Sequence, residues 1–162
     1  MKKRLMIMCA VMLTTLSASA QFEEGKVYIG TSLTGLNLSY NGLEKFNLGM
    51  QAQAGYMVYD NWMVQGQAGY QHYGSDAMAD QIWAGVGLRY YIIENGLFIG
   101  AGAKLVHANH SYNDVMPNIE LGYAFFINGT VTIEPAIYYN QSFKSHSDYS
   151  TIGLRIGIGL YL

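Results

Sequence analysis

Hydrophobic and polar residues alternate over the last twelve positions of the chain, Thr151 to Leu162. The even positions all carry large aliphatic residues: Ile152, Leu154, Ile156, Ile158, Leu160 and Leu162. A period of two over this length predicts one β-strand with two different faces. Glycine occupies three of the odd positions, 153, 157 and 159, although it weakens a solvated strand. The pattern indicates that the polar face is crowded and that the aliphatic face lies against an apolar medium.

The same alternation recurs along most of the chain and predicts eight strands. They cover residues 26–40, 44–59, 62–74, 81–93, 97–109, 117–127, 130–143 and 149–162. Asn41-Gly42 and Asn128-Gly129 are strong two-residue hairpin signals, which favour antiparallel neighbours. The connections after the second, fourth and sixth strands are tight, whereas those at 75–80, 110–116 and 144–148 are longer and polar. This alternation of short and long connections is typical of outer-membrane barrels.

Two irregularities are expected within these strands. The hydrophobic positions change parity at Thr34-Gly35, which predicts a bulge, because one extra residue resets the facing of a strand. Pro135 lies inside the strand at 130–143. Since proline has no amide hydrogen to give to a sheet, we expect a bulge or a missing hydrogen bond there.

All charged residues within the predicted strands fall on the polar face: Lys45, Arg89, Lys104, Glu120, Glu134 and Arg155. An aliphatic exterior requires lipid outside, so the predicted fold is all-β, an eight-stranded antiparallel up-and-down transmembrane β-barrel. Buried charges need partners, and an eight-stranded lumen is narrow. Arg89, Lys104, Glu120, Glu134 and Arg155 are therefore expected to form a structural ion network that fills the lumen. A proton or ion path is the alternative, and a catalytic role for the two glutamates is disfavoured because no substrate fits a filled lumen.

Aromatic residues on the apolar face fall into two groups. One group lies near the tight turns (Tyr56, Trp62, Tyr90 and Phe125) and the other near the longer loops (Tyr40, Phe46, Tyr70 and Tyr139). Two such rows, with small and aliphatic residues between them, match the aromatic girdles at the two levels of lipid headgroups.

The first twenty residues have the pattern of a secretory signal peptide. Lys2, Lys3 and Arg4 precede an apolar stretch that ends before Ala18-Ser19-Ala20, a small-residue cleavage site. The stretch is too short for a membrane-spanning helix. It contains Cys9, the single cysteine, so residues 21–162, the predicted barrel domain, have neither a disulfide nor a thiolate metal site. They carry six basic residues against eleven acidic ones, which argues against nucleic-acid binding.

Low charge content supports the membrane reading. Charged residues make up 12% of the chain and aromatic residues 14%, whereas about 25% of a soluble domain is charged. After residue 20 no apolar run is long enough for a membrane helix, so strands with interleaved hydrophobic residues are favoured.

The four histidines, His72, His107, His110 and His146, all lie toward the predicted loop ends of strands. His110-Ser111 and His146-Ser147-Asp148 contain the residue types of a hydrolytic triad, but nothing in the sequence fixes a triad geometry. Their spacing does not suggest a metal site either. We expect interfacial polar residues, with no catalytic site, no metal and no cofactor.

The chain resembles the small eight-stranded outer-membrane β-barrel family, porin-like and of the OmpX/OmpA type. The resemblance extends over residues 21–162 and rests on the stretches 25–30, 55–62, 88–91 and 157–162. It implies location in the outer membrane of a Gram-negative cell. It also implies that the last strand, with Arg155, Gly157 and Leu160, is read by the barrel-assembly machinery; the family usually ends in Phe, and Leu162 departs from this. Outer-membrane lipids and lipopolysaccharide are the expected partners of a monomer.

Several functions agree with this fold. The favoured one is a non-enzymatic structural or envelope-maintenance barrel with a polar, ion-paired, largely plugged lumen. A membrane-embedded enzyme that modifies lipid A and a small diffusion pore are the alternatives. A soluble lipocalin-like carrier would have an apolar cavity and a charged exterior. The alternation pattern argues against it, because it places Arg89 and Glu120 on the inward face.

Overall fold

The computed structural model describes residues 22–34, 47–73, 80–92, 96–108, 112–144 and 150–162. These residues form nine strand segments: β1 (Val27–Thr34), β2 (Asn47–Tyr59), β3 (Trp62–Tyr73), β4 (Gln81–Tyr91), β5 (Leu97–Ala108), β6 (Tyr112–Tyr123), β7 (Phe125–Phe126), β8 (Val131–Asn140) and β9 (Thr151–Tyr161). No segment of the described chain forms a helix long and apolar enough to cross a membrane.

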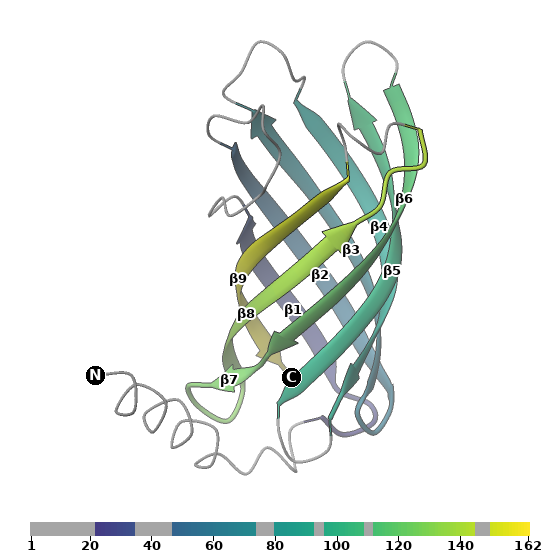
Figure 1. Ribbon diagram of the computed structural model, residues 1–162. Helices are drawn as coiled ribbons and strands as arrows, with labels where there is room; N and C mark the ends of the chain where they lie inside the picture. Colours follow the sequence, from purple (N-terminus) through teal and green to yellow (C-terminus); the bar gives the residue numbers. More distant parts are fainter. Residues whose placement is uncertain (1–21, 35–46, 74–79, 93–95, 109–111, 145–149) are drawn as a thin grey trace, which may run out of the picture.

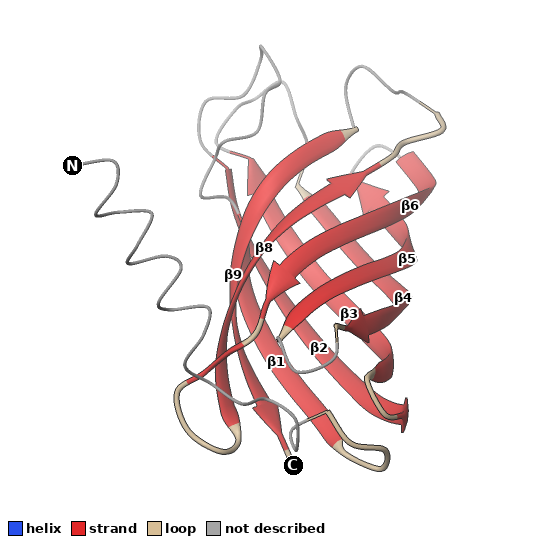
Figure 2. Ribbon diagram, turned by 60° about the horizontal axis from the view of Figure 1, so that its bottom comes forward, coloured by secondary structure: helices blue, strands red, loops and turns tan. Residues whose placement is uncertain are grey.

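The strands close into one barrel (Figures 1 and 2). Every neighbouring pair is antiparallel, in the order β6-β5-β4-β3-β2-β1-β9-β8-β7, and β6 also pairs with β8 to complete the circle. β7 continues the line of β6 after a break at Ala124, so the two segments act as one strand of an eight-stranded barrel. The predicted fold class is confirmed. The tight turns lie at one end with the C-terminus, and we call it the turn end; the opposite end is the loop end (Figure 1).

The break between β6 and β7 lies opposite Pro135. Gly122 pairs with Ala136 on one side of it and Phe125 with Ile133 on the other, so the register is unchanged and no residue is inserted. On the other side the amide of Ala124 donates to the carbonyl of Gly96 at 2.8 Å, which continues the pairing with β5 past Leu97 and Tyr123. Because proline has no amide hydrogen to donate, the ladder between β8 and its neighbour is interrupted here rather than bulged. Of the two outcomes predicted for Pro135, the structure therefore shows the lost hydrogen bond.

One predicted loop is wrong. Residues 110–116 were expected to be a loop, but β6 begins at Tyr112 and pairs with β5 as far as Ala108. Pro117 suggested the start of a strand. It marks instead the place where strand pairing with β8 begins, at Asn118. Toward the loop end β6 pairs in register only with β5, while the segment after β8 contacts it through the Gln141 amide, which donates to the Pro117 carbonyl at 2.9 Å, and through Ser142 Oγ, which donates to Asp114. The strand predicted at 117–127 is therefore displaced and divided.

The other strands agree with prediction apart from their ends. β8 ends at Asn140 rather than Phe143, and β9 begins at Thr151 rather than Tyr149. An irregularity that was not predicted lies in β2, where the register with β3 shifts between Met57 and Tyr59. Three further predictions lie wholly or in part outside the described residues. They are the signal peptide at 1–20, the hairpin at Asn41-Gly42 and the bulge at Thr34-Gly35, of which Gly35 is the first residue of the undescribed range 35–46.

Candidate functional site: the ion-paired lumen

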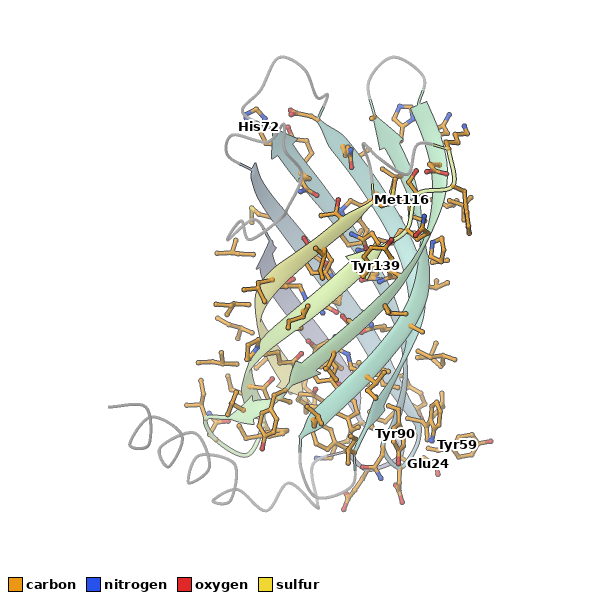
Figure 3. All side chains as sticks on the ribbon, in the orientation of Figure 1. Glu24, Tyr59, His72, Tyr90, Met116 and Tyr139 are labelled. Atoms are coloured by element: carbon orange, nitrogen blue, oxygen red, sulfur yellow. The ribbon has the colours of Figure 1, made fainter. Side chains whose placement is uncertain are left out.

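The barrel is apolar outside and polar inside. Large hydrophobic residues on every full strand are exposed, for example Ile156 at 45% and Leu88 at 49%. The inward positions between them are buried, including Arg89, Lys104, Glu120, Glu134 and Arg155, of which none is more than 6% exposed. Figure 3 shows aliphatic side chains projecting away from the wall along its length. Such an exterior is stable only against lipid.

Arg89 is at the centre of the ion network. Its guanidinium is completely buried, and it donates from Nε to Glu120 Oε1 at 3.0 Å and from Nη1 to Glu134 Oε2 at 3.0 Å. Arg155 forms a second ion pair with the other oxygen of Glu120. One arginine thus joins two carboxylates, and the second arginine completes a chain of four charges with no net charge. Charge-assisted hydrogen bonds of this kind are the strong ones.

Neutral side chains satisfy the rest of the network. Tyr28, Tyr161 and Thr132 each donate a hydroxyl to Glu134, all at 2.9 Å. Arg89 Nη2 donates to Gln53 Oε1 at 3.3 Å, and Arg155 donates to Gln51 Oε1 at 3.4 Å. The glutamines at inward positions 51, 53, 65 and 67 are all buried. The sequence analysis assigned them no role; their spacing at every second position of two adjacent strands was the available signal.

Lys104 lies inside the lumen but outside the ion-paired chain. No carboxylate of the described residues lies within ion-pair distance of its Nζ, which is 4.2 Å from the centre of the Trp83 ring and 5.7 Å from that of Tyr138. The structure thus brings four of the five predicted network residues together and leaves the fifth held by aromatic faces.

An aromatic layer lies inside the lumen at the turn end. Phe22, which precedes β1, is buried and stacks on Tyr91 with ring centres 4.0 Å apart. Its edge contacts Phe126 and Tyr161 at 5.5 and 5.4 Å. The sequence analysis missed this layer because its residues share a face with charged ones. Only Phe22 gave no positional signal at all, since it lies outside any strand.

Glycines make room for these inward side chains. A Cβ at Gly159 would lie 2.6 Å from both the Thr132 hydroxyl and the Tyr28 ring and 2.7 Å from Glu134 Oε1. A Cβ at Gly69 would lie 2.5 Å from the Trp83 ring. These contacts explain why glycine recurs on the polar face.

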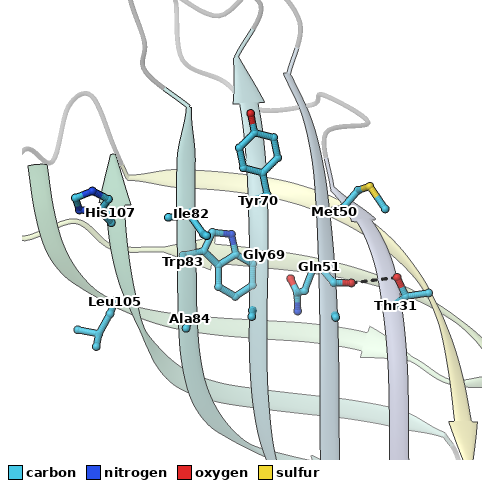
Figure 4. Close-up of a pocket in the computed structure, with 12 residues that line it drawn as sticks. Thr31, Met50, Gln51, Gly69, Tyr70, Ile82, Trp83, Ala84, Leu105 and His107 are labelled. Atoms are coloured by element: carbon cyan, nitrogen blue, oxygen red, sulfur yellow. Dashed lines mark hydrogen bonds between the residues drawn. The ribbon is translucent and has the colours of Figure 1, made fainter. Parts of the chain in front are cut away.

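The predicted aromatic rows are partly described. At the turn end Tyr56 and Trp62 are exposed, and Trp62 lies 4.8 Å from Tyr90 between ring centres. At the loop end Tyr70 is exposed, while Tyr40 and Phe46 lie outside the described residues. Below Tyr70 the outer wall has a shallow hollow of about 580 Å³, floored by Ala52, Ala68 and Ala84 (Figure 4).

The histidines do not form a catalytic group in the described part of the chain. His72 lies at the loop end (Figure 3), with Nδ1 2.9 Å from Asp80 Oδ1, and the other Asp80 oxygen accepts a hydrogen bond from Tyr70. His107 Nδ1 is 2.7 Å from Asn113 Oδ1. His110-Ser111 and His146-Ser147-Asp148 lie outside the described residues. Among described residues there is no cluster of three or more potential metal-binding side chains.

Comparison with known proteins agrees with this geometry. The profile of the family described as "Outer membrane protein beta-barrel domain" matches residues 6–162. The chain belongs to this family. No curated protein sequence matches it significantly.

Similar solved structures support the fold. The N-terminal β-barrel domain of Pseudomonas aeruginosa OprF superposes with a TM-score of 0.66 at 11% identity, covering 86% of this chain and 98% of that one. Neisserial surface protein A gives 0.59 at 11% identity, with coverage of 83% and 95%. OprG from Pseudomonas aeruginosa gives 0.54 at 13% identity, with coverage of 86% and 97%. The predicted family and outer-membrane class are confirmed, and at these identities the likeness concerns the fold.

Proposed function

We propose that this protein is a structural barrel of the outer membrane, with a role in maintaining the envelope and a lumen closed to diffusion. The observation that supports this proposal is the burial of Arg89 between Glu120 and Glu134. A single fully buried guanidinium bridges β4 to β6 and β8, so the network occupies the lumen from wall to wall.

The aromatic layer provides a second closure. Phe22, Tyr91 and Tyr161 fill the turn end directly below the ion network, since Tyr91 and Tyr161 also contact Arg89 and Glu134. An ion that crossed the barrel would have to displace both layers. The role of the protein is therefore to present a rigid, lipid-covered wall, and not to conduct.

Export by the predicted signal peptide, insertion through the barrel-assembly machinery and a monomeric state complete the proposal. Outer-membrane lipids and lipopolysaccharide are the proposed partners of the apolar wall, with acyl chains filling the hollow below Tyr70. A lipid A-modifying activity has no support in the described residues, because neither His72 nor His107 pairs with a serine there. Mass spectrometry of lipid A from cells with and without the protein is expected to show the same acylation.

Planar-bilayer recording tests the closed lumen. The wild-type protein should give no stable conductance step. The double variant R89A/Y91A, which removes one residue from each closing layer, should conduct. L88A changes the neighbouring lipid-facing residue and should behave as the wild type. Stable conductance by the wild-type barrel would overturn the proposal.

A further inference from the structure

The loop-end half of the lumen contains a cavity above the ion network. It has a volume of about 30 Å³ and is lined by inward side chains that include Gln81, Trp83, Lys104, Tyr138 and Arg155. A water molecule needs about 10–15 Å³ by this measure, so the cavity has room for about two waters or one small ion.

Two cations face this cavity, and only one is neutralised. Arg155 is paired with Glu120, and Glu120 and Glu134 together balance Arg155 and Arg89. Among the described residues Lys104 has no carboxylate at ion-pair distance, and the residue is only 6% exposed. A third inward carboxylate, Asp114, lies toward the loop end of β6, accepts a hydrogen bond from Ser142 Oγ and does not line the cavity. Within the described part of the lumen, protonated Lys104 thus gives the cavity one positive charge that no lining carboxylate balances.

An unused hydrogen-bond donor faces the same space. Gln81 is 6% exposed, and its Nε2 has no hydrogen-bond partner among the described residues. A buried donor without a partner costs about 1–3 kcal/mol, and a buried charge without a counterion costs several kcal/mol. One bound anion would relieve both costs.

We propose that this cavity binds a single small monovalent anion, of the size of a halide, between Lys104, Arg155 and Gln81. The ammonium supplies the charge, Arg155 adds to the positive field, and the Gln81 amide donates a hydrogen bond. Asn140 also lines the cavity and has an unpartnered Oδ1; rotation of its amide by 180° presents the NH₂ group instead. The ion enters from the loop end, since the ion network forms the floor.

Size and polarity define the class of ligand. The cavity cannot hold a sugar or a lipid phosphate group with its substituents. Trp83 and Tyr138 cover the sides of Lys104, so the anion approaches the ammonium from the open end, where water would otherwise stand.

Iodide quenching of Trp83 fluorescence tests the proposal directly. The chain has two tryptophans, and the variant W62F leaves Trp83 alone beside the site. In detergent-solubilised, heat-modifiable W62F barrel, iodide should quench in a saturable manner without shortening the fluorescence lifetime, and chloride should reverse the quenching. Adding K104M should weaken iodide binding at least tenfold.

Matched variants separate binding from general accessibility. K144M removes an exposed lysine outside the cavity and should leave saturation unchanged. Q81M should weaken binding less than K104M does, and it serves as the second test if K104M fails to fold. Neutral acrylamide should quench Trp83 equally in all variants. Linear iodide quenching that is the same with and without Lys104 would show that only water occupies the cavity, and would overturn the proposal whatever the bilayer conductance.

Discussion

Removing the charge of two cations buried in the same lumen should change the free energy of unfolding differently at the two positions. Arg89 makes two ion pairs and two further hydrogen bonds, to Tyr91 and Gln53. Lys104 contacts aromatic faces and makes no ion pair with any residue that the structure describes. The variants R89M and K104M each replace a buried cation by an unbranched apolar side chain, so they compare a paired charge with an unpaired one at similar burial.

The magnitude follows from what each substitution leaves behind. Removing one member of a buried ion pair costs about 3–5 kcal/mol. Glu120 keeps Arg155, and Glu134 keeps three hydroxyl donors, so we expect R89M to lose about 3 kcal/mol of unfolding free energy, the lower end of that range. K104M gives up a cation–π contact of about 0.5–2 kcal/mol but also removes an unpaired buried charge. We expect it to be neutral or stabilising.

Reversible unfolding in lipid vesicles measures this difference. Denaturant titrations in a chloride-free gluconate buffer, followed by tryptophan fluorescence and by the heat-dependent shift in gel migration, should separate R89M from K104M by at least about 3 kcal/mol. Equal destabilisation by the two variants would refute the reasoning, because pairing would then not distinguish the two sites. A loss below about 1 kcal/mol for R89M, the size of an exposed pair, would refute it as well.

Three further comparisons test neighbouring parts of the barrel. In the double variant R89M/E134Q, which removes one charge of each sign, we expect about 1–3 kcal/mol of the R89M loss to return; strict additivity in a double-mutant cycle would show that the two residues are not coupled. A Cβ at Gly102 would lie 2.5 Å from the Val86 carbonyl oxygen, whereas one at Gly66 meets nothing within 4 Å, so G102A should cost about 1–3 kcal/mol and G66A should not; equal melting temperatures would contradict this. F22A removes the ring stacked on Tyr91 and should cost about 3 kcal/mol, seen as an earlier thermal shift on gels, and an unchanged shift would mean that Phe22 does not hold the turn end.

Strand alternation made most of the fold predictable. A two-residue period repeated on eight strands specifies which side chains face lipid, and the exposed and buried rows of β9 follow it from Ile152 to Tyr161. The errors fall where a local signal competes with pairing. Pro117 suggested a strand start because proline is rare inside sheets. At that position β6 is tolerant of proline, because strand pairing with β8 ends at Asn118 and only the Pro117 carbonyl is engaged on that side, by the Gln141 amide.

The sequence predicts which charged residues face the lumen, but not which of them form ion pairs with one another. Parity alone places Arg89, Lys104, Glu120, Glu134 and Arg155 in one lumen. Which carboxylate meets which cation depends on the stagger between strands, and the sequence does not specify this. Lys104 and Glu120 lie on adjacent strands, yet Lys104 pairs in register with Met116 and Gly100 with Glu120. The space left by Gly100 is occupied by Glu120, since a Cβ there would lie 2.6 Å from that side chain.

The orientation of the wall can be measured with the two native tryptophans, because Trp62 is 45% exposed on the outside and Trp83 is 8% exposed in the lumen. Lipids brominated near the headgroup end of their acyl chains quench only indoles that touch them. In vesicles of such lipids, the W83F barrel, which keeps Trp62, should lose most of its fluorescence, and the W62F barrel, which keeps Trp83, should lose little. Equal quenching of the two variants, or stronger quenching of Trp83, would contradict an apolar exterior wrapped around an enclosed ionic interior.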